Sequence, residues 1–177
     1  MQPWIWLVMK HKSEMSKKKT ALLDKRLYTL EVFLIDGPIS EKFIKRNPVI
    51  SRTIEIRGHR TLADLHATIF KAFDREEEHM YEFQIGGKGP QDPKAKRYGL
   101  HETIEDSYGK RKLASDTPIG SLNFKVGEPF GYWFDFGDDW WHQINVINIK
   151  EEAPVGKYPK VTKREGASPP QYEHLEE

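Results

Sequence analysis

Three histidines and two aspartates are the side chains that this sequence could use to hold a divalent metal: His66, His79, His142, Asp138 and Asp139. Imidazole nitrogens and carboxylate oxygens are common ligands of zinc and related ions. No two of these histidines stand three or four residues apart, so no single helix presents a chelating pair. A metal-dependent enzyme would therefore need the fold to gather the five side chains. The two aspartates equally suit hydrogen bonds to their own backbone in a turn.

A second set of residues suits binding rather than catalysis. Residues 130–149, FGYWFDFGDDWWHQINVINI, alternate apolar and polar positions as the two strands of a hairpin do. One face of this hairpin carries Trp133, Asp135, Trp141 and Gln143. Two indole rings with a polar rim are typical of contact sites, so this face is the candidate binding surface. The alternative is that the terminal segments of the chain cover both tryptophans.

The register of the hairpin is predicted from its apolar face. Both strands keep their apolar side chains on one side if residues 137–139 form the loop, which places Phe136 opposite Trp140 and Phe134 opposite His142. His142 then lies among apolar neighbours. We expect a neutral imidazole bonded to a backbone group or a carboxylate there, because a charged ring would lose its solvation.

Hydrophobic periodicity predicts the elements that position these side chains. Residues 27–35 and 49–57 alternate as an antiparallel pair of strands joined by a long loop. Thr61 caps a following helix, in which apolar side chains and His66 recur every three or four residues. One buried cluster is expected between helix and sheet: Leu65, Ile69, Phe70, Phe73, Phe83, Phe134 and Ile144.

The rest of the chain divides into a third strand, loops and tails. Residues 79–85 alternate as a strand, and residues 86–112 have no stable period and are expected to form a long loop. Thr117 and Pro118 begin a short helical turn that runs to Leu122. Together these elements predict an α+β fold: a β-grasp-like mixed sheet with one main amphipathic helix across one face and a C-terminal aromatic hairpin.

Composition narrows the function classes. A chain of 177 residues supports one core, and we expect a basic, mobile leader at 1–26, one domain at 27–150 and an extended tail at 151–177. A net charge of +1 gives no global field for nucleic acid. A local nucleic-acid surface would use lysines of the leader (17–19) and basic residues of the loop: Lys94, Lys96, Arg97, Lys110, Arg111 and Lys112.

The cysteine count and the N-terminal sequence bear on compartment. With no cysteine, the chain has no disulfide, thiolate metal site or cysteine nucleophile, which fits a cytoplasmic protein. The apolar run at 3–9 follows no basic residue and precedes no small-residue cleavage site, so a signal peptide is not expected. No apolar run is long enough to span a bilayer, and no membrane partner is expected.

Three segments resemble the pRiA plasmid ORF-3-like family, whose members include passenger proteins of insertion sequences. They are TLADLHATIFKAFDREEEHMYEFQIGG at 61–87, YWFDFGDDWWHQI at 132–144 and YPKVTKREGASPPQY at 158–172. The resemblance spans roughly residues 27–172 and implies a compact α+β domain of β-grasp-like character without an established activity. The family's recurring residues fall on Leu65, His66, Phe73, His79, Phe83, Gly137, Asp138, Trp140 and His142.

The chain departs from the family pattern at two places. Many members have an isoleucine-tryptophan-arginine step where this chain has Ile50-Ser51-Arg52. The usual ending of two prolines, an acidic pair, a cysteine and two glycines is reduced to residues 169–172, PPQY.

The sequence therefore favours a non-catalytic accessory or binding domain associated with plasmids and mobile elements. An unidentified protein partner is expected, nucleic acid is the second candidate partner, and no cofactor or bound metal is expected. The alternative is a metal-dependent enzyme that acts on nucleic acid or another phosphoester through the histidine and aspartate cluster, and no catalytic residue is identified.

Overall fold

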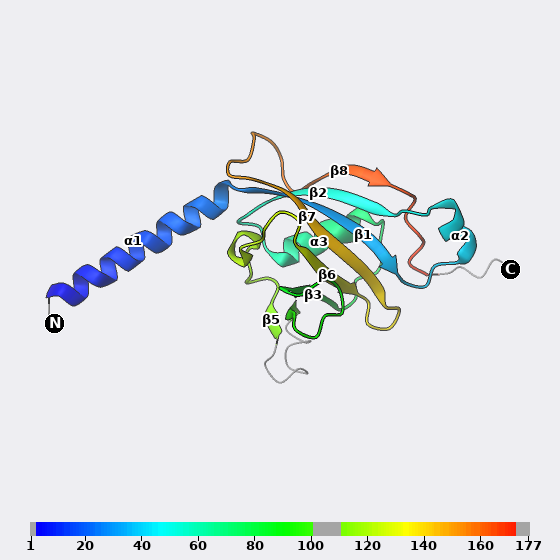
Figure 1. Ribbon diagram of the computed structural model, residues 1–177, viewed down its shortest axis with the longest axis horizontal. Helices are drawn as coiled ribbons and strands as arrows, with labels where there is room; N and C mark the ends of the chain where they lie inside the picture. The colour runs from blue at the N-terminus through cyan, green and yellow to red at the C-terminus, as the bar shows by residue number, and fades with distance from the viewer. Residues whose placement is uncertain (1–2, 101–110, 173–177) are drawn as a thin grey trace.

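The computed structural model describes residues 3–100 and 111–172, and its centre is one eight-stranded sheet (Figure 1). The strands are β1 (Leu27–Asp36), β2 (Ser51–Arg57), β3 (Tyr81–Ile85), β4 (Lys96–Gly99), β5 (Arg111–Leu113), β6 (Pro129–Phe134), β7 (Trp140–Lys150) and β8 (Lys160–Glu165). The helices are α1 (Pro3–Lys25), α2 (Glu41–Arg46), α3 (Leu62–Ala72) and the 3-10 helix η1 (Ile119–Leu122). The strand order is β5-β4-β3-β6-β7-β1-β2-β8, antiparallel throughout except that β4 and β5 are parallel.

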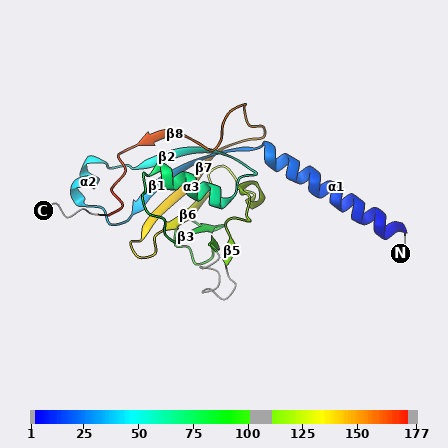
Figure 2. The same ribbon diagram turned by 180° about the vertical axis from the view of Figure 1, so that it is seen from behind.

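Helix α3 lies across one face of the sheet, which we call the inner face (Figure 2). Thr61 accepts a hydrogen bond from the backbone of Asp64, whose side chain in turn accepts one from the Thr61 backbone. This capping box satisfies two backbone donors and confirms the predicted start of the helix. The predicted core is confirmed as one cluster of buried side chains, although Phe70 is only partly buried at its margin. The α+β class is also confirmed, whereas the β-grasp-like description stays a prediction.

The pairing of β1 with β2 is antiparallel, as predicted. Their connection contains helix α2 where a long loop was predicted, because α2 is only six residues long, buries none of them and so has no apolar periodicity. Ser40 caps α2 by accepting a hydrogen bond from the backbone of Phe43. Short helices of this kind depend on local capping rather than on a periodic apolar face.

The predicted register between β6 and β7 is wrong by two residues. Phe134 lies opposite Trp140, and Tyr132 lies opposite His142. The turn therefore contains residues 135–139 instead of 137–139. A shift of two keeps every strand side chain on its predicted face, because the side-chain period of a strand is two. Phe136 is the exception, since it belongs to the turn and stacks on Trp133 instead of lying on the apolar face.

The segment at 86–112 contains regular structure where a loop was predicted. β4 pairs with β3, and β5 extends the sheet beside β4; residues 101–110, with Lys110, lie outside the described residues. Between β3 and β4 the chain crosses the outer face of the sheet, the face opposite α3. A Cβ at Gly131 would lie 2.8 Å from the Cα of Pro90, so this crossing segment packs directly on β6.

The C-terminal segment adds β8 to the edge of the sheet beside β2. Beyond β8 it passes the end of α3, where the buried Arg52 donates hydrogen bonds to the carbonyl groups of Ala72 and Glu165. Gln171 then accepts hydrogen bonds from the backbone of Glu76 and Glu77 at 2.8 and 3.0 Å. These contacts fix the loop that follows α3, which carries part of the candidate site.

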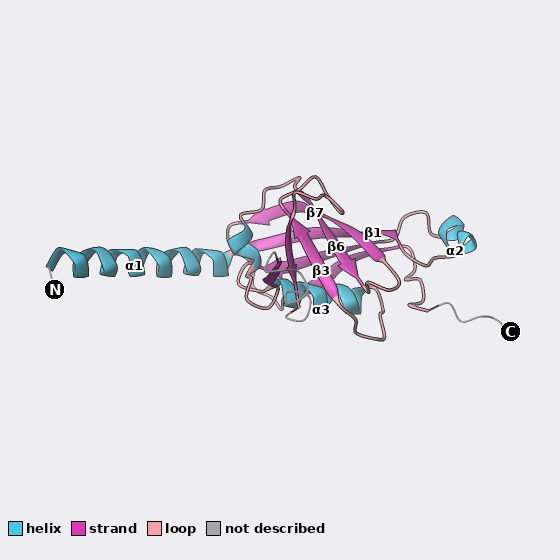
Figure 3. Cartoon of the chain, turned by 90° about the horizontal axis from the view of Figure 1, so that it is seen from below, coloured by secondary structure: helices cyan, strands magenta, loops and turns pink. Residues whose placement is uncertain are grey.

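Helix α1 leaves the sheet at the start of β1 and extends away from the domain (Figures 1 and 3). Its junction is held by hydrogen bonds from the backbone of Gly58 to Arg26 and of Ala153 to Lys25, and by an ion pair between Arg26 and Glu151. Within residues 3–100 and 111–172, no helix combines the length and the apolar character needed to cross a membrane.

Candidate functional site

The five-residue turn between β6 and β7 organises the candidate site. Asp135 adopts a positive φ of 57°, and its carboxylate accepts hydrogen bonds from the backbone of Gly137 and Asp138. Aspartate tolerates this left-handed conformation because its short side chain bonds the local backbone. The turn presents Phe136 and Asp139 toward the outer face of the sheet and Asp135 toward a pocket beside α3.

Three aromatic rings form a stack on the outer face, which we call the aromatic ladder: Trp141, Trp133 and Phe136. The two indoles are 4.8 Å apart with an angle of 7° between their planes, and Phe136 lies 3.9 Å from Trp133. The Trp133 indole donates a hydrogen bond to Asp139 at 2.9 Å, which fixes the ring. All three rings are half-buried, so part of each aromatic surface is available for contact.

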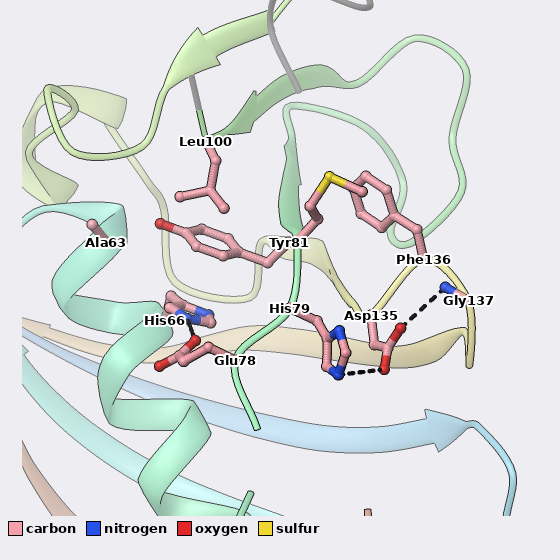
Figure 4. A pocket seen from close by; sticks show the side chains of 10 residues that line it. Ala63, His66, Glu78, His79, Tyr81, Leu100, Asp135, Phe136 and Gly137 are labelled. Atoms are coloured by element: carbon pink, nitrogen blue, oxygen red, sulfur yellow. Dashed lines mark hydrogen bonds and ion pairs between the residues drawn. The ribbon is translucent and has the colours of Figure 1, made fainter. Parts of the chain in front are cut away.

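The other side of the turn borders an open pocket of about 730 Å³ (Figure 4). Its apolar lining comes from Ala63, Met80, Tyr81, Leu100 and Phe136, and its polar lining comes from His66, Glu78, His79 and Asp135, with Gly137 at the turn. A partly apolar pocket with a few convergent polar groups is the usual form of a binding site. Phe136 joins the pocket to the aromatic ladder.

His66 forms the centre of a hydrogen-bonded chain at the base of this pocket. The Tyr132 hydroxyl bonds its Nδ1 at 2.7 Å, and its Nε2 bonds the Glu78 carboxylate at 2.9 Å. Burial lowers the pKa of His66, although Glu78 partly opposes this effect. The neutral ring therefore donates from Nε2 to Glu78 and accepts at Nδ1 from Tyr132, whose pKa burial raises well above its usual value. Because both nitrogens are engaged, His66 serves as a fixed part of the wall.

His79 forms a second pair at the pocket rim. Its Nε2 lies 3.4 Å from a carboxylate oxygen of Asp135 and 2.8 Å from the hydroxyl of Tyr172, which donates to Glu77. Lost solvation, the bond to Glu77 and the nearby charges of Asp135 and Asp138 raise the pKa of Tyr172 to about 12. The carboxylates of Glu77, Asp135 and Asp138 lie around this pair, and their charge favours a cationic ligand over a phosphate at the rim.

His142 lies apart from the pocket, buried among aromatic rings. Its ring centroid is 5.1 Å from both Phe73 and Tyr132, and it is 1% exposed. Neither ring nitrogen makes a hydrogen bond of ordinary geometry among the described residues, although backbone groups of Tyr132 and Trp140 lie near the ring and partly oppose the effect of burial on its pKa. Burial, followed by the nearby charge of Arg75, lowers the pKa of His142 to about 3.

Arg75 is the buried cation next to His142. Its guanidinium lies 3.6 Å from the ring centroid of Trp140, and burial lowers its pKa to about 10. It therefore keeps its charge at neutral pH, held by a cation–π contact. Its Nη1 and Nη2 atoms find no hydrogen-bond partner within the described part of the chain.

The five predicted metal ligands are not gathered into one group. His66 and His79 line the pocket in separate pairs with carboxylates, Asp138 and Asp139 lie in the turn, and His142 is buried beneath. Across the described ranges, no three histidine or acidic side chains are placed to hold a metal ion.

Sequence spacing does not indicate that Glu78, Tyr81 or Phe136 belong to the site, and strand alternation predicts Asp135 on the outer face with Gln143. No local spacing links Glu78 to His66, twelve residues away, so only the tertiary fold reveals that pair. Gln143 does lie on the outer face, where its side chain donates to Asn145. Asp135 could have been placed by recognising it as the first residue of the turn.

The nucleic-acid surface expected from the basic loop stays a prediction, because Lys110 lies outside the described residues. Arg97 pairs with the fully buried Glu82 at 2.6 Å. Lys94 and Lys96 are exposed around the start of β4, away from the pocket lining.

The sheet with α3 across one face, and a turn that joins an aromatic ladder to a pocket, belong to one small α+β domain. The model of the family described as plasmid pRiA4b ORF-3-like protein matches residues 42–172, and the chain belongs to that family.

Among solved structures, the chain is similar in fold to a protein of unknown function from Methanosarcina mazei Go1. The identity is 22%, the TM-score is 0.63, and the alignment covers 83% of this chain and 73% of that chain. Among curated proteins, none matches the chain.

Proposed function

We propose that this chain is a non-catalytic binding domain that recognises a basic, partly apolar segment of a protein partner. The observation that carries the proposal is the continuity of the aromatic ladder with the acidic pocket through Phe136. A protein segment that crosses the turn would contact both surfaces at once. The family description refers to a plasmid open reading frame, which supports an accessory role in plasmids or other mobile elements. We expect this role to be cytoplasmic, as the cysteine-free sequence suggests.

The aromatic ladder supports recognition of apolar and guanidinium groups. Stacked indoles present flat surfaces that are already ordered, so a partner binds them with little loss of side-chain entropy. Arginine stacks on such rings through cation–π contact. The Trp133 ring is held in place by Trp141 and Phe136, between which it stacks, and by its hydrogen bond to Asp139.

The charge around the pocket supports a basic partner. The Glu78 side chain lies beside a neutral His66 and is 63% exposed. Exposed acidic side chains continue from Glu78 to Glu76 and Glu77 on one side, and to Asp139 on the other. Together with Asp135 they form what we call the acidic rim, which repels phosphate groups and attracts lysine and arginine.

The alternative function, a metal-dependent enzyme, has less support than a binding domain. Its ligands would have to come from two separate histidine–carboxylate pairs, and the acidic rim would repel a phosphoester substrate. The nucleic-acid partner meets the same repulsion at the candidate site.

A panel of labelled peptides tests the proposal. We would measure fluorescence anisotropy of 15-residue peptides of four kinds: basic with leucine, acidic with leucine, neutral, and proline-rich. The basic peptides with leucine should bind most tightly, and Trp141→Ala should weaken their binding at least tenfold. The ring is half-buried on the surface, so this variant should remain folded.

Tyr158→Ala is the matched control, because Tyr158 is an aromatic residue that contacts Arg57 and Lys160 instead of the ladder. It should bind as the original chain does. Equal binding of acidic and basic peptides, or unchanged binding by Trp141→Ala, would contradict the proposal. Single-stranded DNA that binds independently of Trp141 would move the function to the lysine-rich segments.

A further inference from the structure

We propose that the aromatic ladder receives helix α1 of a second copy of this chain. This inference rests on the proposed function, since it identifies one partner of the same surface. It follows from two apolar surfaces that each copy leaves exposed, from the fixed direction of α1, and from the opposite charges of the two surfaces.

The first exposed surface extends the ladder across the outer face of the sheet. Phe33 of β1 lies opposite Gln143 of β7, on the same face as Trp141. Phe33 and Ile35 line a second open pocket, of about 420 Å³, and Ile35 is 51% exposed. We call the ladder with Phe33 and Ile35 the outer patch. An exposed apolar surface that crosses three strands is typical of an interaction site.

The second exposed surface is the first half of α1. Ile5, Val8 and Met9 stand at helical spacing and are 37%, 47% and 64% exposed, and Met15 continues the row at 60%. From residue 3 to 15 the helix is about 20 Å long. The strands that carry the outer patch, with their neighbour β2, span about 14 Å from axis to axis, so this half of the helix is long enough to cross them.

A copy cannot place α1 on its own outer patch. Only Arg26 separates the helix from β1, and both sides of this junction are bonded to the domain, at Gly58 and at Ala153. The helix therefore keeps the direction seen in Figure 3, pointing away from the sheet. Its apolar row is presented to another molecule.

Charge favours a second copy as that molecule. Helix α1 carries the exposed Lys17 and Lys18 beyond the end of its apolar row and the exposed Lys12 within it, and the acidic rim adjoins the outer patch at Phe136. Pairing of two α1 helices with each other is disfavoured. The seam at 5, 8, 12 and 15 has the spacing of a coiled coil but contains Lys12, which would face a like charge in a parallel pair.

Sedimentation velocity on the full chain tests the inference. The original chain should sediment as a pair at tens of micromolar. Val8→Glu with Met15→Glu changes exposed positions of α1 and should raise the dissociation constant at least tenfold. Trp141→Ala with Ile35→Glu changes the outer patch and should do the same. Val155→Glu, at a fully exposed loop position, adds one glutamate elsewhere and should leave the pair intact.

Mixing the two double variants is the decisive step. One retains an intact outer patch and the other an intact helix, so the mixture should form pairs although neither variant does so alone. A mixture that stays monomeric would overturn helix-to-sheet docking, and so would an original chain that stays monomeric at 100 micromolar. Cosedimentation of a monomeric chain with anionic vesicles would assign α1 to a membrane surface and would also overturn it.

The peptide panel separates this inference from the proposed function. A monomeric chain that still binds basic peptides through Trp141 would leave the proposed function standing without the second copy. If pairs form but no peptide binds, the inference would stand and the outer patch would bind only helix α1 of a second copy.

Discussion

Truncating Phe134 to alanine is expected to lower the free energy of unfolding by about 3 to 5 kcal/mol. The ring is 1% exposed and meets Phe70 edge to face at 5.9 Å, with His66 and His79 at 6.1 and 6.0 Å. Strand β6 is paired on both sides, so its backbone cannot move to fill the cavity. Equilibrium unfolding in urea measures the loss.

Phe136→Ala is the matched control, because it removes the same side chain two residues later from a half-buried position. Its effect should be clearly smaller, about 1 kcal/mol, since the remaining space is open to solvent. Equal losses for the two variants would show that Phe134 does not lie in the core between α3 and the sheet.

Replacing His142 by leucine is expected to make the fold more resistant to acid. The ring has a pKa of about 3 in the folded chain and about 6.5 when unfolded, so the unfolded state binds the additional proton between these values. The contribution of the neutral ring to the free energy of unfolding is therefore fully present above pH 6.5 and is lost as the pH falls toward 3. At pH 4.5 the original chain should have lost about 2 to 3 kcal/mol that His142→Leu retains.

At pH 8 the same variant should be as stable as the original chain or slightly more stable. Leucine fills a similar volume and removes two nitrogens that lack hydrogen-bond partners among the described residues. His59→Leu, at an exposed loop position, is the control and should leave the pH dependence of stability unchanged. If the free energy of unfolding depends on pH in the same way for His142→Leu and the original chain, His142 is not held neutral by burial.

The sequence predicts those helices and strands whose capping residues and apolar spacing lie within the element itself. The capping box of Thr61 and Asp64 and the apolar spacing of α3 lie within one helix, and the structure confirms both. Strand β4 and the edge strand β8 carry mostly polar side chains, so they show no apolar alternation. They form because the neighbouring strands β3 and β2 offer backbone hydrogen bonds, which a side-chain pattern does not record.

The candidate site was predicted only in part because its geometry depends on turn length and tertiary contact. Alternation assigned Trp133 and Trp141 to the outer face correctly, since strand faces have a period of two. Alternation does not determine how many residues a turn contains. Here the turn begins at Asp135, which has a positive φ, and is two residues longer than predicted. The pairing of His66 with Glu78 required the loop after α3, which the C-terminal Gln171 holds in place.

Indole NMR signals test the central claim most directly, because they report each tryptophan separately. A ¹⁵N-labelled chain would be titrated with the basic, leucine-containing peptide, with signals assigned from single Trp→Phe variants. We predict that the Trp133 and Trp141 signals shift with peptide concentration, while the signal of the fully buried Trp140 stays in place as an internal reference. Saturable binding that leaves both the Trp133 and Trp141 signals unmoved would contradict the assignment of the aromatic ladder as the binding surface.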